Sequence, residues 1–564
     1  MLQPQAARRI AVVGAGWAGL SSARLLADAG YPVEVFEAAP QAGGRARAVE
    51  VPLAGGRARV DNGQHLLIGA YRAVRTLLAQ YAGSHGHALQ PAGFHIAGYH
   101  AGHPARHHAA HHAAHPAGSY AGYHAGHHAG HLATRPIRLA QSPGVEALQG
   151  RLSALPILAQ SAGAQAALVA LRQASWLLGS RRVPLAWMAG LRKLLRATVH
   201  RPPAPGEALG SYVHSLRLAH DLRHGFLAAL AESALNVNLE HACALRFALV
   251  VREAFGGMSQ DAAHFLHPQG DLSRLLPEAL IAGKAPGGPP LRIRYRARVD
   301  ELLRSDAPPA GERNWWLRVH GEPTLLGPFH HVVLALDPAS LRRLASDQIQ
   351  RRQAYPTASG AKDDQTLRRL KAALASLPPA RGIFTRWLAL RGAPPSLPVL
   401  ALPVLAQPVP GSPVPGSPVP GSPVPPPTSR TGETGHSASA WVFPRPGGRG
   451  LAPESAPRAS SAGFDCLAGL VVSAVDDREA AARIALRTCS DLGLDVVDHF
   501  DIEERRAATP SLAGLEWPAF DLCGSEGLWL AGDWVGDGSG SALPATLESA
   551  VRSALAVARA IQTA

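Results

Sequence analysis

The sequence predicts an α/β protein with two domains, and three observations carry this expectation. A glycine-rich motif, Gly14-Ala-Gly-Trp-Ala-Gly19, directly follows a short apolar run near the start of the chain. A second apolar run near the end leads into Gly532 and Asp533. The chain has 564 residues, which is too long for a single hydrophobic core. Together these features predict a Rossmann-like dinucleotide-binding domain joined to an α+β domain that holds the substrate.

The first element is the apolar run Ile10 to Val13, which is typical of a buried parallel strand. A helix is expected to follow over residues 20–29, and its free N–H groups and positive dipole end suit a pyrophosphate. The first glycine of the motif allows the tight turn, the second lets the backbone approach the phosphates, and the third lets helix and strand pack closely. The predicted residues of this turn are Gly14, Gly16, Trp17, Ala18 and Gly19.

A second strand is expected over residues 32–36, and it ends in Glu37. An acidic residue about 20 positions beyond the glycine motif is the usual acceptor for a ribose hydroxyl. Strand, turn, helix, second strand and acid therefore occur in the order that dinucleotide binding requires.

Two details favour FAD over NAD. Gly44 and Arg45 lie just beyond the ribose acid, where a guanidinium can reach the phosphates with its planar donor fork. At the other end of the chain, residues 528–531 are expected to form a strand that delivers Gly532 and Asp533, and a carboxylate there suits the ribityl hydroxyls of a flavin. The alternative is that Asp533 is an ordinary residue of a turn at a strand end.

Further motifs occur in the rest of the chain. They are Asp61-Asn-Gly-Gln-His-Leu-Leu67 with Gly69-Ala-Tyr71, Leu235-Asn236, Trp441-Val-Phe443, Glu504-Arg-Arg-Ala507 and the segment 531–552. With the glycine motif, they resemble the FAD-dependent amine oxidase and phytoene desaturase superfamily, and within it the squalene-associated branch of hydroxysqualene dehydroxylases. The resemblance covers most of the chain outside two low-complexity stretches.

The resemblance implies an FAD-binding domain of the glutathione reductase type, discontinuous in sequence. Its predicted pieces are residues 1–82, 271–339 and 509–564, and the substrate domain would comprise residues 83–270 and 340–508. Strands are expected over residues 291–299, 315–319 and 332–336, and helices over residues 223–234 and 242–251. Val299 matches the position whose backbone meets the adenine.

The resemblance also implies the reaction, which is the reductive removal of the hydroxyl of hydroxysqualene to give squalene for hopanoid or triterpene synthesis. The hydride would come from N5 of the reduced flavin, and the electron donor that reduces the flavin stays unidentified. Three alternatives remain: a polyene desaturase of the carotenoid type, a flavin amine oxidase, and a flavin-binding or metal-buffering scaffold that is not an enzyme.

The proton donor for such a reaction is expected in the Asp61 to Leu67 motif, which in the superfamily passes beside the flavin ring. Asp61 and His65 are the two candidates, because burial favours a protonated carboxyl and histidine titrates near neutrality. The alternative is that Asp61 caps a turn and His65 packs by the ring. Gly63 and Gln64 would allow close backbone approach to the ring. Residues that open the last helix, Pro544, Ala545 and Thr546, would turn its N-terminus toward the reduced ring.

Composition narrows the partners and the compartment. The formal net charge is +14, but no basic-aromatic stripe or nucleic-acid motif accompanies it, so nucleic acid is not expected as a partner. The four cysteines are scattered, which suits a reducing cytoplasm. The early start of the FAD strand leaves no room for a signal peptide.

Two segments bear on membrane association. Polar residues make residues 152–171 a poor membrane span. Residues 176–196 combine apolar and basic side chains, which fits either an interfacial helix at the inner membrane face or a cap on the substrate domain.

Two stretches are expected to lack a packed structure. Residues 95–131 repeat Ala, Gly and His with irregular spacing, which favours a low-complexity insertion over a metal site. Residues 408–440 contain tandem Gly-Ser-Pro-Val-Pro pentads and favour an extended, polyproline-like linker. No metal ligand is predicted in the chain.

Overall fold

The computed structural model describes sixteen segments of the chain. They are residues 8–65, 67–82, 89–92, 94–97, 137–139, 183–255, 265–268, 270–283, 290–305, 314–354, 360–392, 399–401, 440–444, 464–472, 477–539 and 543–564. The segment 152–171, judged a poor membrane span, and the proline-rich pentads lie outside these residues.

A five-stranded parallel sheet forms the first layer of the fold. Its strand order is β10-β2-β1-β14-β20. The strands are β10 (Arg292–Arg294), β2 (Val33–Phe36), β1 (Ile10–Val13), β14 (His331–Leu334) and β20 (Leu528–Leu530). Strands from three distant parts of the sequence thus lie side by side, and the predicted α/β class with a Rossmann-like sheet is confirmed. The predicted domain limits themselves stay a prediction.

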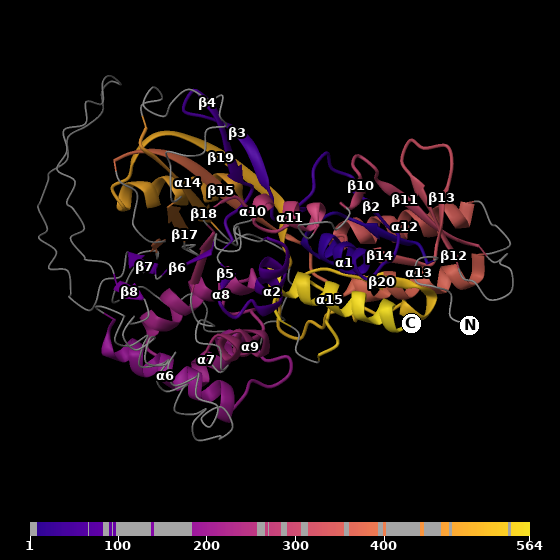
Figure 1. Ribbon diagram of the computed structural model, residues 1–564. Coiled ribbons are helices and arrows are strands. Elements are labelled where there is room, and N and C mark those ends of the chain that lie inside the picture. Colours follow the sequence, from indigo (N-terminus) through magenta and orange to yellow (C-terminus); the bar gives the residue numbers. More distant parts are fainter. Residues whose placement is uncertain are drawn as a thin grey trace, which may run out of the picture.

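Two helices from opposite ends of the chain cover one face of this sheet. Helix α1 (Trp17–Asp28) follows β1 and packs along α15 (Leu547–Thr563), as Figure 1 shows. Their apolar sides meet in one core with the sheet, which includes Leu20, Val35 and Val551, each fully buried. The packing brings the N-terminal ends of both helices to the same edge of the sheet as the ends of β1 and β2.

The opposite face is covered by a three-stranded sheet and two helices. The sheet has the order β11-β12-β13, with β11 (Val299–Ser305), β12 (Asn314–Val319) and β13 (Leu326–Phe329), and the helices are α12 (Pro338–Ala354) and α13 (Gly360–Ala375). The strand predicted over residues 291–299 is wrong as one element. It divides into β10 and the start of β11 at a turn in which Arg296 has a φ of 56°. This left-handed conformation bends the chain from one sheet into the other.

A second large sheet forms the other half of the molecule (Figure 1). Its order is β19-β15-β18-β17-β16-β7-β8. The strands are β19 (Asp495–Ala508), β15 (Arg381–Arg391), β18 (Cys466–Val472), β17 (Ala440–Pro444), β16 (Val399–Ala401), β7 (Phe94–Ala97) and β8 (Ile137–Leu139), with α14 (Arg478–Asp491) packed on it. Two predicted low-complexity limits need correction, because His95 to Ala97 belong to β7 and Ala440 begins β17; residues 98–131 and 408–439 lie outside the described residues.

Helices close this half below the sheet. They are α6 (Leu185–His200), α7 (Leu209–Ser215), the π-helical turn Leu222–Leu227, α8 (Ala228–Leu235) and α9 (Ala244–Phe255). The remaining elements are β3 (Ala48–Leu53), β4 (Gly56–Asp61), β5 (Leu67–Ile68), α2 (Arg72–Tyr81), β6 (Leu89–Ala92), β9 (Phe265–Pro268), α10 (Leu272–Leu275), α11 (Pro277–Ala282) and the 3-10 turn Gly524–Glu526. The helices expected over residues 223–234 and 242–251 are thus present with shifted limits.

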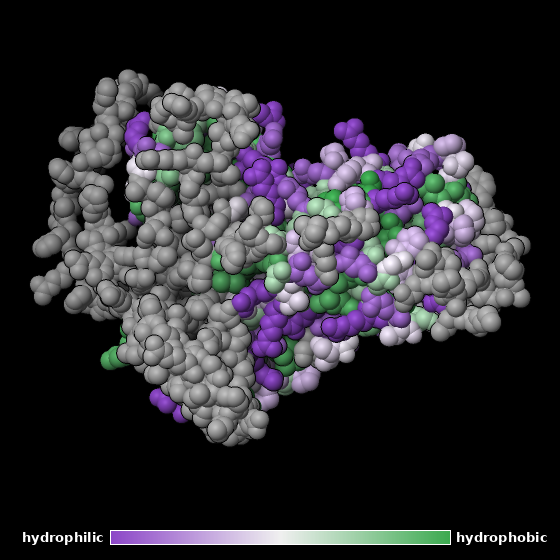
Figure 2. All heavy atoms as spheres, in the orientation of Figure 1, coloured by the Kyte–Doolittle hydropathy of each residue, from purple (hydrophilic) through white to green (hydrophobic). Residues whose placement is uncertain are grey.

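Helix α6 corresponds to the described part of the expected interfacial segment. Trp187 and Leu194 are buried in the helical core, so this apolar face is used for packing. The outer face exposes 81% of Leu185 beside the basic side chains of Arg192 and Lys193. The cap is therefore present, and membrane contact stays a prediction. Among the described helices, α-helical segments long and apolar enough to cross a bilayer are absent. Figure 2 shows hydrophilic side chains gathered along the boundary between the two halves on the face it presents.

The first sheet contains a histidine that should make folding sensitive to acid. His331 on β14 accepts a hydrogen bond from the indole N–H of Trp529 at 3.2 Å, a bond that requires an unprotonated Nδ1. Burial, with the nearby charge of Arg8, lowers the pKa of His331 to about 4. Protonation therefore favours the unfolded chain, and stability present above pH 6.5 is lost as the pH falls toward 4. We expect the free energy of unfolding of His331→Gln, measured in urea from pH 7 to pH 4.5, to fall less with pH than that of the unsubstituted protein. An equal fall in the two proteins would contradict this prediction.

Candidate functional site

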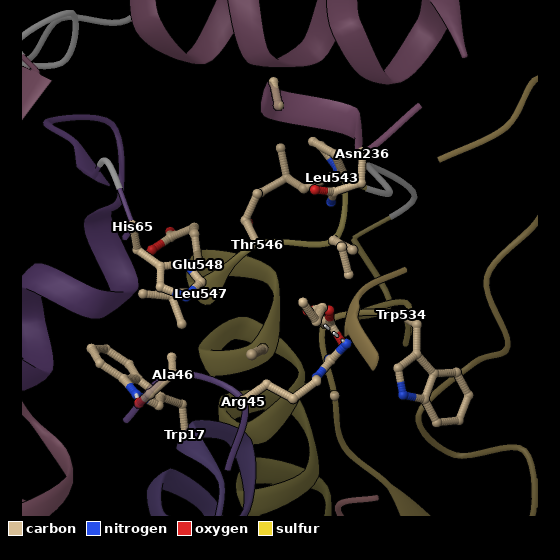
Figure 3. Close-up of a pocket in the computed structure, with 18 of the residues that line it drawn as sticks. Trp17, Arg45, Ala46, His65, Asn236, Trp534, Leu543, Thr546, Leu547 and Glu548 are labelled. Atoms are coloured by element: carbon tan, nitrogen blue, oxygen red, sulfur yellow. Dashed lines mark hydrogen bonds and ion pairs between the residues drawn. The ribbon is translucent and has the colours of Figure 1, made fainter. Parts of the chain in front are cut away.

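A cavity of about 500 Å³ lies where the glycine turn, the start of α15 and the helices of the second half meet. Most of the predicted site residues line it (Figure 3). These are Gly14, Gly16, Trp17, Ala18, Glu37, Gly44, Arg45, Gln64, His65, Gly532, Asp533, Pro544, Ala545 and Thr546. Ligands of open α/β sheets bind outside the carboxyl ends of the strands, and this cavity occupies that place.

The three motif glycines have different physical roles. Gly14 has a φ of +106°, and a Cβ there would lie 2.4 Å from the carbonyl oxygen of Ala335. A Cβ on Gly19 would lie 1.9 Å from the carbonyl oxygen of Gly14, so Gly19 serves helix–strand packing and does not line the cavity. At Gly16 the nearest atom to an added Cβ is 3.7 Å away. The space beside Gly16 is therefore not filled by other protein atoms and forms part of the cavity.

Glu37 ends β2 with its carboxylate held against the glycine turn. One oxygen accepts the backbone N–H of Ala15 at 2.7 Å, and the other accepts that of Ala39 at 2.8 Å. Each oxygen retains a lone pair for a ligand hydroxyl. Val299 does not line the cavity, but its neighbour Ala297 donates its N–H to the Glu37 carbonyl at 2.8 Å. The segment that was expected to contact an adenine therefore lies next to Glu37 in the fold.

Arg45 and Asp533 form an ion pair across the cavity, although the sequence separates them by most of its length (Figure 3). Arg45 also donates to the carbonyl of Ala507 and to the hydroxyl of Thr509, each at 3.4 Å. Asn62 fixes the loop that carries Arg45, since its side chain accepts the N–H of Arg47 and donates to the Arg45 carbonyl, both at 3.1 Å. The sequence did not single out Asn62 for this role.

The N-terminus of α15 faces the cavity through its capping residue. Thr546 accepts the N–H of Ser549 at 3.2 Å, and the Ser549 hydroxyl accepts the N–H of Thr546 at 2.8 Å. This reciprocal cap leaves other N–H groups of the first turn near Pro544 and Ala545, which line the cavity. A helix N-terminus of this kind stabilises negative charge.

Glu548 in the same turn has a role that the sequence does not reveal. Its two oxygens accept the N–H groups of Ala73 at 3.0 Å and Val74 at 3.1 Å, both in the first turn of α2. The Arg552 guanidinium donates to the same carboxylate at 2.8 Å. Since the Glu548 side chain is only 1% exposed, this carboxylate links the starts of two helices from opposite ends of the chain.

The two predicted acids are placed differently. Asp61 does not line the cavity; its buried carboxylate accepts the N–H of Leu272 at 2.8 Å, and its backbone carbonyl accepts the indole N–H of Trp387 at 2.9 Å. Asp61 therefore caps the start of α10. His65 lines the cavity, where burial and the charge of Arg45 lower its pKa to about 4. Its imidazole is neutral at neutral pH.

The residues beside His65 show a further difference between prediction and structure. Gln64 lines the cavity, and its side chain packs against Gly469 of β18, where an added Cβ would approach it to 3.0 Å. Gly63 lies outside the lining. Tyr71 is part of the Gly69 to Tyr71 motif, but the sequence alone predicts no function for it. It lines the cavity beside Thr546, and burial raises the pKa of its hydroxyl. Tyr71 thus keeps its proton and can donate a hydrogen bond.

The cavity continues into an apolar chamber in the second half of the molecule. Its walls come from α8, α9 and the strands β9, β15, β17 and β18. The apolar side chains of this chamber are Leu230, Phe247, Val250, Val251, Phe265, Ile383, Trp441, Phe443 and Val471. One cavity therefore joins a phosphate-binding turn to a chamber suited to a lipophilic molecule.

The geometry fits a dinucleotide whose second half is a flavin. The open space at Gly16 and the Glu37 carboxylate fit the pyrophosphate and the adenosine ribose. Arg45, Asp533 and the start of α15 line the same cavity and continue its polar wall. Among the described residues, clusters of ligands able to hold a metal ion are absent.

Comparison with known proteins agrees with this geometry. Residues 12–81 match the family model described as an NAD(P)-binding Rossmann-like domain. The chain is 38% identical over 74 residues to a hydroxysqualene dehydroxylase of Zymomonas mobilis, and 41% identical over 68 residues to one of Sinorhizobium fredii. These alignments cover 13% and 12% of this chain, and only 17% and 16% of those relatives.

The likeness in structure extends over nearly all of the chain. An oxidoreductase from Methanosarcina mazei superposes with a TM-score of 0.55 at 14% identity, covering 98% of this chain and 100% of the other. At this sequence identity, the likeness shows a shared fold and does not show a shared reaction. The chain therefore has a Rossmann-like, dinucleotide-binding α/β fold shared with a structurally known oxidoreductase.

Proposed function

We propose that this chain is an FAD-dependent oxidoreductase that reductively removes the hydroxyl of hydroxysqualene to give squalene. The observation that carries the proposal is the single cavity, in which a dinucleotide-binding turn opens into an apolar chamber. The matches to hydroxysqualene dehydroxylases, which cover 13% and 12% of this chain, support this substrate class.

In this proposal, each part of the cavity wall has one task. The Gly14 to Gly19 turn and Arg45 would hold the pyrophosphate, Glu37 the ribose, and Asp533 the ribityl hydroxyls. Residues 544–546 would hold the ring. When bound and reduced, FAD supplies the hydride. The chamber walls would position the isoprenoid chain and exclude water.

Two cavity residues are suited to act on the leaving hydroxyl. Burial, the larger cause of the lowered pKa of His65, would remain in the complex, while the phosphates of a bound dinucleotide would offset the smaller contribution of the Arg45 charge. Tyr71 would donate a hydrogen bond at neutral pH. Asp61, held at the start of α10, has no part in this proposal.

A single anaerobic turnover tests the proposal. The full-length, FAD-loaded protein is photoreduced and mixed with hydroxysqualene in detergent, and flavin absorbance and extracted products are followed together. We expect squalene to appear as the flavin reoxidises, and a Gly16→Ala variant that retains no FAD to give none. Stable reduced flavin with untouched substrate would contradict the proposal. Oxidised enzyme would then be offered a polyene and an amine, to test desaturase and amine oxidase activity.

A further inference from the structure

An acidic side chain stands in the apolar chamber at a place that helix stability does not favour. Glu253 lies in the last turn of α9 and lines the cavity beside Val250 and Ala254. The C-terminal end of a helix carries partial negative charge, so a carboxylate there is unfavourable unless another group compensates it. A purely structural reason for Glu253 must therefore come from a partner outside α9.

That partner is Arg552, and it holds only part of the carboxylate. Glu253 Oε2 lies 3.6 Å from an Arg552 nitrogen and is shielded from solvent, and no hydrogen bond from another described residue reaches this oxygen. Yet 31% of the Glu253 side chain is exposed. One oxygen is thus held by an ion pair, and the side chain as a whole lines the cavity and stays partly exposed.

Arg552 is itself fixed from the other side. It donates to Glu548 at 2.8 Å in the first turn of α15, where residues 544–546 line the cavity. Burial alone would lower the pKa of Arg552, but the hydrogen bond and charge of Glu548 and the charge of Glu253 raise it. The Glu253 carboxylate is therefore linked through one side chain to the helix start that faces the proposed flavin.

The other polar side chains in this part of the chamber differ from Glu253. The Ser233 hydroxyl accepts the indole N–H of Trp441 at 2.7 Å and donates to the Ala229 carbonyl at 2.8 Å, so both its functions are used. Asn236 ends α8 with a φ of 57° and lines the cavity with a neutral carboxamide. Among the described residues that line the cavity, Glu253 alone has a buried side-chain oxygen without a hydrogen-bond partner.

We propose that Glu253 accepts a hydrogen bond from the hydroxyl of a lipophilic alcohol and thereby makes the chamber prefer the alcohol to the corresponding hydrocarbon. The inference deepens the proposed function and rests on it for the identity of the alcohol. A site built to bond a hydroxyl discriminates against an analogue that lacks it, because the acceptor is then desolvated without a partner. Such a preference would also let the hydrocarbon product leave.

The groups around Glu253 distinguish a hydroxyl from an ammonium group. The Arg552 guanidinium lies 3.6 Å from Glu253 Oε2, so an added ammonium group would have to approach an existing positive charge. A hydroxyl carries no charge and needs only a hydrogen-bond acceptor.

The test measures binding without turnover. Full-length, FAD-loaded, oxidised protein is incubated with hydroxysqualene, with squalene, and with the amine that replaces the hydroxyl by an amino group, all in the same detergent. The ligand retained after gel filtration is quantified by mass spectrometry. We expect the alcohol to bind about tenfold more tightly than the hydrocarbon in the unsubstituted protein. Glu253→Leu should bind the two alike, and the isosteric Glu253→Gln, which keeps a neutral acceptor, should show an intermediate preference.

The control is Glu301→Leu, which removes a carboxylate paired with Arg318 at 2.9 Å on β11, away from the cavity lining. This variant should keep the full preference for the alcohol. An unchanged preference in Glu253→Leu and Glu253→Gln would overturn the inference while leaving turnover to decide the function separately. A preference lost only in Asn236→Leu, tighter binding of the amine, or equal binding of alcohol and hydrocarbon by the unsubstituted protein would also overturn it. Loss of preference in the Glu253 variants supports it whether or not squalene is formed.

Discussion

Gly16→Ala should abolish the retention of FAD and leave the fold intact. The backbone of Gly16 has a φ of −76° and a ψ of −179°, a conformation that alanine adopts without strain. An added Cβ would meet its nearest protein atom, the Cα of Gly44, only at 3.7 Å, which is an ordinary contact. The methyl group would instead stand where the pyrophosphate must approach the backbone. Loss of hydrogen bonds to a charged group predicts FAD binding weakened on the order of 100-fold.

The measurement pairs flavin content after gel filtration with the free energy of unfolding in urea. The free energy of unfolding should change by no more than about 1 kcal/mol. Alanine stabilises by about 0.4–1 kcal/mol through the lower entropy of the unfolded chain, and this offsets the preference for glycine over alanine at the N-cap of α1. Gly56→Ala is the matched control, because an added Cβ there meets only the Leu53 carbonyl oxygen at 3.9 Å, in a hairpin away from the cavity lining. It should keep its flavin. If Gly16→Ala retains FAD as well as Gly56→Ala does, the dinucleotide does not bind at this turn.

The parts of the fold that could be predicted are those that local pattern determines. The apolar run Ile10 to Val13 is β1 at its predicted limits, and the glycine turn needs residues without a Cβ at positions that a sequence shows directly. The break between β10 and β11 has no such signature, since its left-handed residue is Arg296 and not glycine. Tertiary contact imposed that turn, and the prediction of one continuous strand failed there.

The candidate site divides in the same way. Arg45 and Asp533 were predicted from two motifs that each suggest a cofactor contact, and the structure shows them paired. The roles of Asp61 and Glu548 depend on partners far away in sequence, since Asp61 bonds Leu272 and Glu548 bonds Ala73 and Val74. By sequence alone, a carboxylate that caps a distant helix cannot be distinguished from one that binds a substrate, because both are acidic residues close to a cofactor-binding motif.

Glu548→Ala should be among the most destabilising single substitutions in the described part of the chain. The carboxylate is 1% exposed, accepts the N–H groups of Ala73 and Val74 in the first turn of α2, and pairs with Arg552, whose side chain is itself only 21% exposed. Removing one partner of a buried ion pair typically costs about 3–5 kcal/mol when it leaves a charge uncompensated, and the remaining ion pair of Arg552 with Glu253 at 3.6 Å should reduce this cost. The lost helix cap adds to this, at about 1 kcal/mol. Glu548→Gln should cost less, because its carbonyl oxygen can still accept one N–H.

Glu479→Ala is the matched control for this prediction. Glu479 also lies in the first turn of a helix, α14, and also pairs with an arginine four residues later, Arg483, at 3.8 Å, but its side chain is 87% exposed. An exposed pair of this kind is worth about 0.3–0.5 kcal/mol, so urea unfolding should hardly shift. Similar losses in the two variants would show that Glu548 is an ordinary dipole-compensating residue. A loss confined to Glu548 would show that one carboxylate fastens the start of α2 to the start of α15, the two helix ends that frame the cavity.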